Sequence, residues 1–300
     1  MIYGMIESFT LISMLIFGAV TKSYITRMFK SNSGEPYAGK LHVRFLEEFI
    51  SNCLIIREGE NLLMYKVERA IIMAAGFGSR MSPLTLETPK PLVKVNGVRM
   101  IDTVIDALHK NGIYEIYVVV GYLKEKFYGL EKEYAGLKVI DNPYFDTCNN
   151  IASLYVVRDY IENAIILDGD QIIFNPEILK PEFERSGYNS VYVENGTDEW
   201  LQQVENGIVT SCSRTGGLKG WQLYSISRWN SQDGKQLKQD LEYEFDTKQN
   251  RQIYWDDVAM FCHPEHYQLG VMPMKKEDVV EIDGLDELIE IDSSYRGYKK

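Results

Sequence analysis

Cysteine, proline and positive charge are all scarce in this 300-residue sequence. The four cysteines lie far apart and form no CxxC pair, so we expect no disulfide framework and a reducing, cytoplasmic environment. With 32 Lys and Arg against 43 Asp and Glu, the net charge of -11 argues against a broad cationic surface for nucleic acid. The 9 prolines and 45% hydrophobic residues are typical of a folded globular protein and exclude a disordered or fibrous one.

Long apolar runs are missing as well. The most apolar segment, residues 9–20, would form a helix of about 18 Å, which is too short for a hydrocarbon core of roughly 30 Å. Only Glu7 is charged before this segment and no small-residue cleavage site follows it, which disfavours a secretion signal. We therefore expect no membrane span. A buried or interfacial helix is the first interpretation, and a membrane-surface anchor is the alternative.

The sequence divides near Lys66. Residues 1–67 combine an apolar start, a basic stretch and a helical pattern, and they end in a hairpin pattern. This small N-terminal unit could be winged-helix-like, but no clear turn between two helices is legible and its charge is nearly balanced. An appendage for packing or for homo-oligomerisation is the simpler interpretation. Residues 68–292 are expected to form the main domain, and residues 293–300 a frayed tail.

Short apolar segments alternate with helical patterns from residue 69 onward. This order predicts an α/β fold with a Rossmann-like, mostly parallel mixed sheet and helices on both faces. The expected strands are residues 70–74, 116–120, 138–140 and 164–167, and the expected helices are residues 98–108, 123–134 and 151–160. After Pro181 the pattern predicts an antiparallel excursion on the substrate side, with strands at 190–194, 200–204 and 208–213. Helices at 231–245 and 255–261 and a strand and helix within 281–292 complete the prediction.

The most informative segment follows the first expected strand. It reads AAGFGSRMSPLT from Ala74 and continues with TPKPL up to residue 92. Gly76 and Gly78 let the backbone turn and direct its N–H groups at phosphate oxygens, while Arg80 and Lys90 add positive charge. The dinucleotide pattern GxGxxG fails because Met81 replaces its third glycine, and GxxxxGK[ST] is absent. Neither common nucleotide motif explains the segment.

The whole segment resembles the signature AAGxGxRxxPLTxxxPKPL of the nucleotidyltransferases of the sugar-nucleotide pyrophosphorylase type. The resemblance covers about residues 66–292. It favours the LicC-type CTP:phosphocholine cytidylyltransferases, through VGYLKE (120–125), NN (149–150), SLY (153–155), DGD (168–170), TDEW (197–200) and YWD (254–256). It implies CTP and phosphocholine as substrates, and CDP-choline and pyrophosphate as products. A sugar 1-phosphate or 2-aminoethylphosphonate as acceptor, or a nucleotide sensor without turnover, are the alternatives.

The reaction brings several negative charges together, because a phosphate oxygen must attack the α-phosphorus of a nucleoside triphosphate. A divalent cation is the simplest counter-charge, and Mg²⁺ takes carboxylate oxygens as ligands. Asp170 and Asp256 match the family's two metal-binding aspartates by resemblance, with Asp168 and Asp257 as neighbours that could replace them. The alternative is a turn aspartate and a helix-capping aspartate.

The resemblance also assigns ligand contacts. Lys90 and Arg80 are the candidate catalytic cations, since they would face the phosphates. The candidate nucleotide-binding residues are Ala74, Ala75, Gly76, Gly78, Asn149 and Ser153, although Asn149 and Asn150 could equally cap a helix. A quaternary ammonium is recognised by aromatic faces, and the candidates for such a cage are Trp200, Tyr254 and Trp255, with Tyr224 as a further one.

Two other clusters invite an interpretation. The run CHPEH at residues 262–266 contains potential zinc ligands, but Pro264 interrupts any helix and no second cluster completes a tetrahedral site. The acidic residues between Glu277 and Asp292 are expected to be a solvated strand and helix face.

Overall fold

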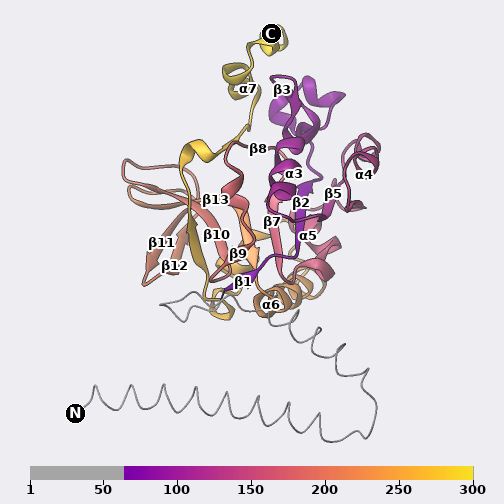
Figure 1. The fold of residues 1–300 in the computed structure, drawn as a ribbon. Helices are drawn as coiled ribbons and strands as arrows, with labels where there is room; N and C mark the ends of the chain where they lie inside the picture. The colour runs from indigo at the N-terminus through magenta and orange to yellow at the C-terminus, as the bar shows by residue number, and fades with distance from the viewer. Residues whose placement is uncertain (1–63, 300) are drawn as a thin grey trace, which may run out of the picture. The chain divides into compact units, whose positions relative to one another are not determined.

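The computed structural model describes residues 64–299, and the N-terminal unit expected at residues 1–67 falls almost entirely outside them. The centre is a nine-stranded mixed sheet (Figure 1). Its parallel part has the order β6-β5-β2-β7, formed by Leu137–Asp141, Glu115–Val120, Arg69–Ala74 and Ala164–Asp168. Parallel strands place their carboxyl ends at one edge of the sheet, so the turns after β2, β5, β6 and β7 meet there.

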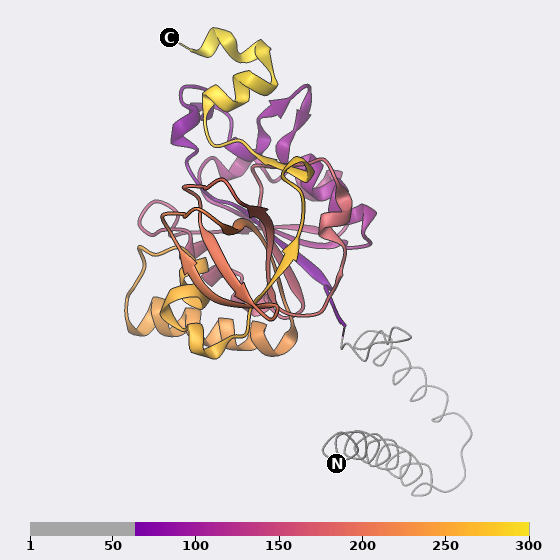
Figure 2. The same ribbon diagram turned by 90° about the vertical axis from the view of Figure 1, so that its left-hand side faces the viewer.

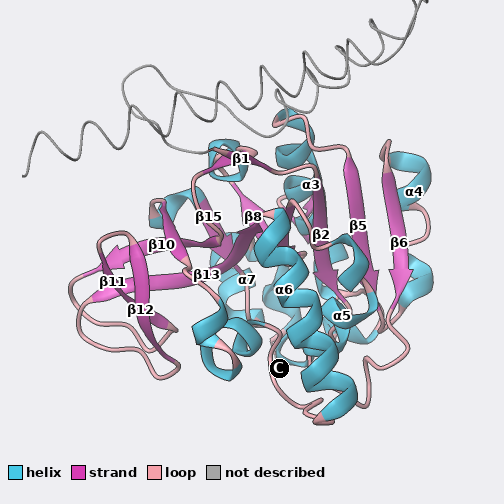
Figure 3. Cartoon of the chain, turned by 90° about the horizontal axis from the view of Figure 1, so that it is seen from below, coloured by secondary structure: helices cyan, strands magenta, loops and turns pink. Residues whose placement is uncertain are grey.

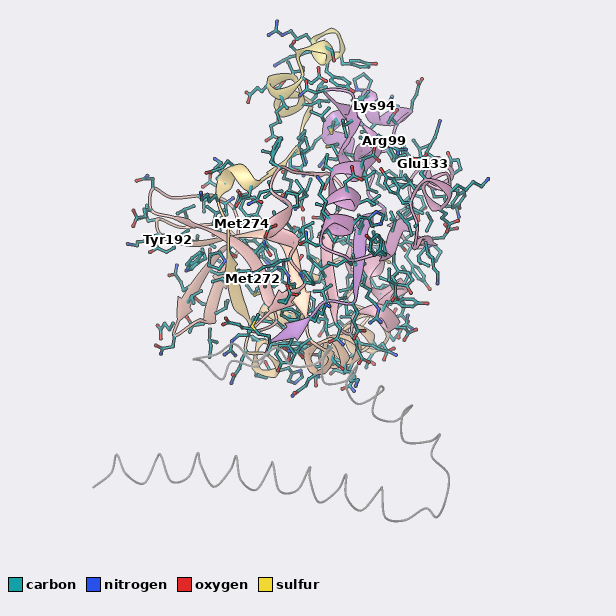
Figure 4. All side chains as sticks on the ribbon, in the orientation of Figure 1. Lys94, Arg99, Glu133, Tyr192, Met272 and Met274 are labelled. Carbon is teal, nitrogen blue, oxygen red and sulfur yellow. The ribbon has the colours of Figure 1, made fainter. Side chains whose placement is uncertain are left out.

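The antiparallel part begins at β13 (Gly220–Trp229), which pairs with β7. Strand β13 then pairs with β10 and β11, and β11 pairs with β12 through a hairpin at Asn206 and Gly207. The bounds of these strands are Gly187–Val193 (β10), Leu201–Glu205 (β11) and Ile208–Ser213 (β12). Strand β14 (Gly270–Pro273) completes the sheet and pairs with β10 in parallel. In Figure 4, Tyr192 lies at the outer end of this ribbon, while Met272 and Met274 lie further in, near β14.

Within the described residues, three smaller sheets are formed by pairs of short strands. They are β1 (Tyr65–Lys66) with β9 (Glu182–Phe183), β3 (Lys94–Val95) with β4 (Val98–Arg99), and β8 (Gln171–Ile173) with β15 (Val279–Glu281). The helices are α3 (Met100–Lys110), α4 (Leu130–Glu133), α5 (Ile151–Val156), α6 (Ser231–Glu242) and α7 (Leu285–Ile291). Wider π-helical turns extend α6 through Tyr243–Thr247 and form Val258–Cys262.

Alternating residues of the parallel strands face two separate cores. On β2, Ala70 and Ile72 pack with α3, whereas Ile71 and Met73 pack with α5 and α6. Figure 3 shows α5 and α6 together on the second face. This alternation follows from the two-residue period of a strand, and it explains why β2 is a continuous apolar run.

A third, smaller core joins the C-terminal segment to the segment that follows β2. Met81, Val95 and Met100 pack against Ile282 and Leu288. In Figure 2, the yellow α7 accordingly lies beside the purple segment that contains β3 and β4. Residues 293–298, expected to be frayed, form a 3-10 helix in which Tyr295 donates its hydroxyl to the Lys94 carbonyl at 2.6 Å.

The predicted α/β fold is confirmed, with helices on both faces of a mixed sheet. The prediction missed β13, the longest strand and the link between the two halves of the sheet. The helix expected at 123–134 is broken into short turns, of which α4 is the longest. Among the described residues, no helix is both long and apolar enough to cross a membrane.

Truncation of the central strand tests the first core. The Ile72 side chain is fully buried, so Ile72→Ala should lower the free energy of unfolding by roughly 2–5 kcal/mol. Leu218→Ala is the matched control, because Leu218 is 83% exposed and its loss should change stability by less than about 0.5 kcal/mol. Urea denaturation followed by circular dichroism measures both. Equal losses would place Ile72 outside the core.

Candidate functional site

The turn after β2 wraps around Gly78. This glycine has a φ of +62°, and a Cβ there would lie 3.0 Å from the Lys90 Cβ and the Thr85 Cγ2. The Thr85 hydroxyl donates to the Gly78 carbonyl at 2.9 Å, which fixes the turn. Only glycine fits both the left-handed backbone and the close approach of Lys90. The turn therefore brings Lys90, twelve residues later in the chain, directly under the glycine loop.

Lys90 is buried among carboxylates. Its Nζ lies 2.6 Å from Asp170 Oδ2 and 3.3 Å from Asp283 Oδ1, and only 8% of its side chain is exposed. Arg80 Nη2 lies 2.8 Å from the same Asp283 oxygen. Burial alone would lower the pKa of the Lys90 ammonium, but the nearby Asp170 and Asp283 outweigh it and the pKa lies above its ordinary value. Lys90 is thus a fixed positive charge.

Three carboxylates form the acidic centre of the site. Asp168, Asp170 and Glu281 each place one oxygen within 4.8 Å of the others. Burial and the adjacent carboxylates raise the pKa of Asp168 and of Glu281 well above their ordinary values. Asp170 Oδ1 is buried and has no hydrogen-bond partner among the described residues. Crowded carboxylates with an unpartnered oxygen are a donor set that fits a hard divalent cation.

The acidic centre contains Asp170 of the predicted pair, together with Asp168 and Glu281. Asp256 lies outside this group of three but lines a pocket with Asp168 and Glu281, so the pairing of Asp170 with Asp256 stays a prediction. Glu281 reaches the site because β15 pairs with β8 in a register that places Glu281 opposite Gln171, next to Asp170. The prediction of a fully solvated acidic face at 277–292 is therefore wrong for Glu281 and for Asp283, which contacts Lys90.

Three pockets that share lining residues lie at the carboxyl edge of the sheet, and two of them border the acidic centre. Each is named here for the part of the substrates that it is proposed below to bind. The first, here the phosphate pocket, is lined by Met73, Ala74, Gly76, Gly78, Ser79, Arg80, Lys90, Pro91, Asp170 and Asp283. The second, here the acceptor pocket, is lined by Asn150, Asp168, Glu199, Trp200, Leu223, Ser225, Tyr254, Asp256 and Glu281. The third, here the nucleoside pocket, is lined by Ala75, Gly76, Phe77, Asn142, Phe145, Asp146, Thr147, Cys148, Asn149, Asn150, Ser153 and Gln252. Gly76 borders the phosphate and nucleoside pockets, and Asn150 the nucleoside and acceptor pockets.

The nucleoside pocket contains the predicted Ala75, Asn149 and Ser153. The two asparagines do not cap α5 through their side chains. Instead, the Asn149 amide donates to the Gln252 carbonyl at 3.1 Å, and Asn150 Oδ1 accepts the Trp255 N–H at 2.9 Å. They tie the start of α5 to the segment that carries the acceptor pocket.

Aromatic residues that the sequence did not single out wall the nucleoside pocket. Phe77 packs against Tyr122 and Phe145, with ring centroids 5.2 and 5.5 Å apart. Phe145 lies so close to Gly121 that a Cβ on Gly121 would be 2.4 Å from the Phe145 Cβ. Gly121 therefore leaves room for this wall.

Two of the three expected cage residues reach the acceptor pocket. The rings of Trp200 and Tyr254 stand nearly perpendicular at 87°, with centroids 6.1 Å apart, and we call this pair the aromatic corner. Trp255 requires a correction, because its side chain is 1% exposed and packs in the core beside Tyr188. Tyr224 is also buried in the core. The side chains of successive residues point in different directions, so Tyr254 faces the pocket while Trp255 anchors the segment.

Asp256 and Asp257 follow the aromatic corner but have separate environments. Burial and the charge of Asp257 raise the pKa of Asp256 to about 7, and its Oδ1 has no partner among residues 64–299. Asp256 lines the acceptor pocket, and its unpartnered Oδ1 is itself buried. Asp257 instead accepts hydrogen bonds from the Arg214 guanidinium.

The CHPEH run forms a hydrogen-bonded cluster. His263 Nε2 lies 2.8 Å from Glu244 Oε1, and His266 Nδ1 lies 2.9 Å from Asp240 Oδ2. Asp240, His263 and His266 place ligand atoms within 4.8 Å of one another. However, the two imidazoles stack with only 13° between their planes. A ligating imidazole directs its lone pair in its own plane, so parallel rings do not converge on one ion.

Comparison with known proteins agrees with this geometry. A profile of the MobA-like NTP transferase domain matches residues 70–216. A 2-aminoethylphosphonate cytidylyltransferase of Lancefieldella rimae is 35% identical over 228 residues, which is 75% of this chain and 92% of the relative. A choline-phosphate cytidylyltransferase of Streptococcus pneumoniae is 31% identical over 225 residues, 73% of this chain and 94% of the relative.

A solved structure extends the similarity to the fold. The CTP:phosphocholine cytidylyltransferase LicC from Streptococcus pneumoniae superimposes with a TM-score of 0.69 and 29% sequence identity, covering 76% of this chain and 99% of that protein. The signature loop, the acidic centre and the three pockets all lie within residues 64–299. On these grounds the chain belongs to the cytidylyltransferases, a family of nucleotidyltransferase enzymes.

Proposed function

We propose that this protein transfers CMP from CTP to phosphocholine in a magnesium-dependent reaction that gives CDP-choline and pyrophosphate. The observation that carries the proposal is the position of the acidic centre between the phosphate pocket and the acceptor pocket, since Asp170 lines one and Asp168 and Glu281 line the other. A reaction that joins two phosphate-bearing molecules needs counter-charge at this border.

Asp168, Asp170 and Glu281 would hold Mg²⁺. When bound, the ion supplies positive charge to the crowded phosphate oxygens and helps to orient them. These three residues fit the ion because their oxygens already lie together. The raised pKa values of Asp168 and Glu281 reflect the same crowding of negative charge, together with burial. Asp256, the second metal ligand that the resemblance implies, lines the acceptor pocket beside Asp168 and Glu281, and its role as a ligand stays a prediction.

Binding and orientation of CTP fall to the signature loop. The backbone N–H groups around Gly76 and Gly78 direct partial positive charge at the triphosphate, and Lys90 and Arg80 add full charges. An oxygen of the acceptor phosphate attacks the α-phosphorus, the bond to the β-phosphate oxygen breaks, and pyrophosphate leaves towards Arg80 and Lys90. The acceptor oxygen is already anionic, so this step needs no general base.

The aromatic corner supports choline as the acceptor head. A trimethylammonium group cannot donate a hydrogen bond, and aromatic faces attract it by roughly 0.5–2 kcal/mol per contact. Trp200 and Tyr254 offer two such faces at right angles, and Leu223 adds an apolar wall.

A second acceptor, 2-aminoethylphosphonate, is supported by a different observation. Only two of the three expected aromatic residues line the pocket, whereas the carboxylates of Glu199 and Asp256 lie beside them. A primary ammonium donates hydrogen bonds and prefers carboxylates to aromatic faces. The Lancefieldella rimae relative bears the name of this activity.

Substrate competition separates the two acceptors. We expect pyrophosphate release by the full chain with Mg²⁺ and CTP, and a higher kcat/KM for phosphocholine than for 2-aminoethylphosphonate. The same assay with ATP, GTP and UTP, and with glucose 1-phosphate, provides the controls. A preference for 2-aminoethylphosphonate would replace choline but retain the mechanism. If neither acceptor gives pyrophosphate release, the proposed function is wrong.

The aromatic corner gives a sharper prediction. Trp200→Ala should raise the KM for phosphocholine roughly 2- to 30-fold, the equivalent of one cation–π contact, and leave the KM for CTP unchanged. Trp255→Ala should act differently, because it creates a core cavity that costs about 3–5 kcal/mol of unfolding free energy. Steady-state kinetics and thermal melting distinguish the two variants. Equal KM changes for both substrates in Trp200→Ala would remove Trp200 from the acceptor pocket.

The acidic centre is tested by direct cation binding. Glu281→Gln removes one of three clustered carboxylates, so we expect Mn²⁺ binding, measured by electron paramagnetic resonance, to weaken about tenfold or more. Glu290→Gln is the control on the same C-terminal segment, because Glu290 is exposed. This variant should bind Mn²⁺ as tightly as the unmodified protein does. Unchanged Mn²⁺ affinity in Glu281→Gln would exclude Glu281 as a ligand.

A further inference from the structure

We propose that Arg214 is a positioning residue for the acceptor pocket, which holds the aromatic corner in place without touching the acceptor. This inference deepens the proposed function and rests on it. Arg214 follows β12 on the antiparallel ribbon, far in sequence from the YWD motif at residues 254–256. It is not among the residues that line the acceptor pocket in the described part of the chain.

The first contact of Arg214 is with a buried carboxylate. Its Nε and Nη2 donate to Asp257 Oδ1 at 2.9 and 2.5 Å. The other Asp257 oxygen, Oδ2, accepts the Tyr254 N–H at 2.9 Å. One carboxylate therefore connects the guanidinium to the backbone of Tyr254. The Asp257 side chain is 5% exposed, so it holds both bonds in an environment where charge-assisted hydrogen bonds are strong.

The second contact of Arg214 is with aromatic rings. Its Cζ lies 3.7 Å from the centroid of Phe261 and 5.7 Å from that of Trp200. Phe261 in turn packs edge-on against Trp200, with centroids 5.4 Å apart and planes at 80°. The planar guanidinium stacks on Phe261 while its edge donates to Asp257, a combination that the ammonium of lysine cannot reproduce.

These contacts fix both walls of the aromatic corner from behind. Tyr254 is held through Asp257, and Trp200 is held through Phe261 and Arg214 itself. An acceptor that binds by aromatic faces gains full attraction only when both rings are already in place, because ordering them on binding costs free energy. Arg214 supplies that order before the acceptor arrives.

The charge of Arg214 would repel a cationic acceptor if it were unpaired. Its partner Asp257 cancels that charge within hydrogen-bond distance. Besides the two carboxylates assigned to the metal ion, the acceptor pocket retains Glu199 and Asp256 as lining residues. The acceptor pocket therefore stays electronegative although an arginine stabilises its walls.

The experiment compares Arg214→Gln and Arg214→Lys with the unmodified full chain by steady-state kinetics. We expect Arg214→Gln to raise the KM for the preferred acceptor about tenfold, with the KM for CTP and the kcat nearly unchanged. Arg214→Lys keeps the charge but loses the planar fork of the guanidinium. Its KM for the acceptor should therefore lie between that of the unmodified chain and that of Arg214→Gln. Lys219→Gln is the matched control, because Lys219 is a cation on the same ribbon whose ion pair with Glu194 is exposed.

The outcomes separate this inference from the proposed function. If the unmodified chain turns over an acceptor but Arg214→Gln leaves the acceptor KM within about twofold, or raises both KM values equally, the inference is wrong and the function stands. If the unmodified chain turns over neither acceptor, both fail. Should Arg214→Gln not fold, as judged by circular dichroism, Arg214→Lys decides by the same KM comparison.

Discussion

Crowding of negative charge at one edge of the sheet is the constraint that shapes this protein. Asp168, Asp170 and Glu281 would repel one another strongly, and the raised pKa of Asp168 and Glu281 records that repulsion together with burial. The fold tolerates this arrangement because Lys90 is held rigidly against Asp170. The glycine turn at Gly78 is what allows Lys90 to reach that position. The acidic centre and the glycine turn are thus two parts of one electrostatic arrangement.

The scaffold accounts for the order of the three pockets. The parallel strands end at a common edge, so the turns after β2, β6 and β7 line the phosphate and nucleoside pockets from neighbouring positions. The antiparallel strand β13 beside β7 adds Leu223 and Ser225 to the acceptor pocket. Apart from Asn150, the nucleoside pocket and the acceptor pocket are therefore lined by different residues of the chain.

Local patterns predicted the parallel strands and the signature loop, because the residues that define a buried strand or its glycine turn lie within about ten positions of one another. Pairings between distant segments were not legible in this way. The sequence alone did not distinguish Glu281 from the exposed acidic residues around it, because only the pairing of β15 with β8 brings it to the site. Strand β13 was missed although it joins both halves of the sheet. The YWD motif indicated three neighbouring site residues, but only the fold decides that Tyr254 faces the pocket and Trp255 the core.

Asp283 gives the phosphate pocket an internal anion. Its Oδ1 contacts both Arg80 and Lys90, the two groups that a polyphosphate would contact. If the proposed function holds, a triphosphate bound at this place would exchange one anion for another rather than meet two bare cations. The C-terminal segment that packs on the loop would then compete with the triphosphate for Arg80 and Lys90.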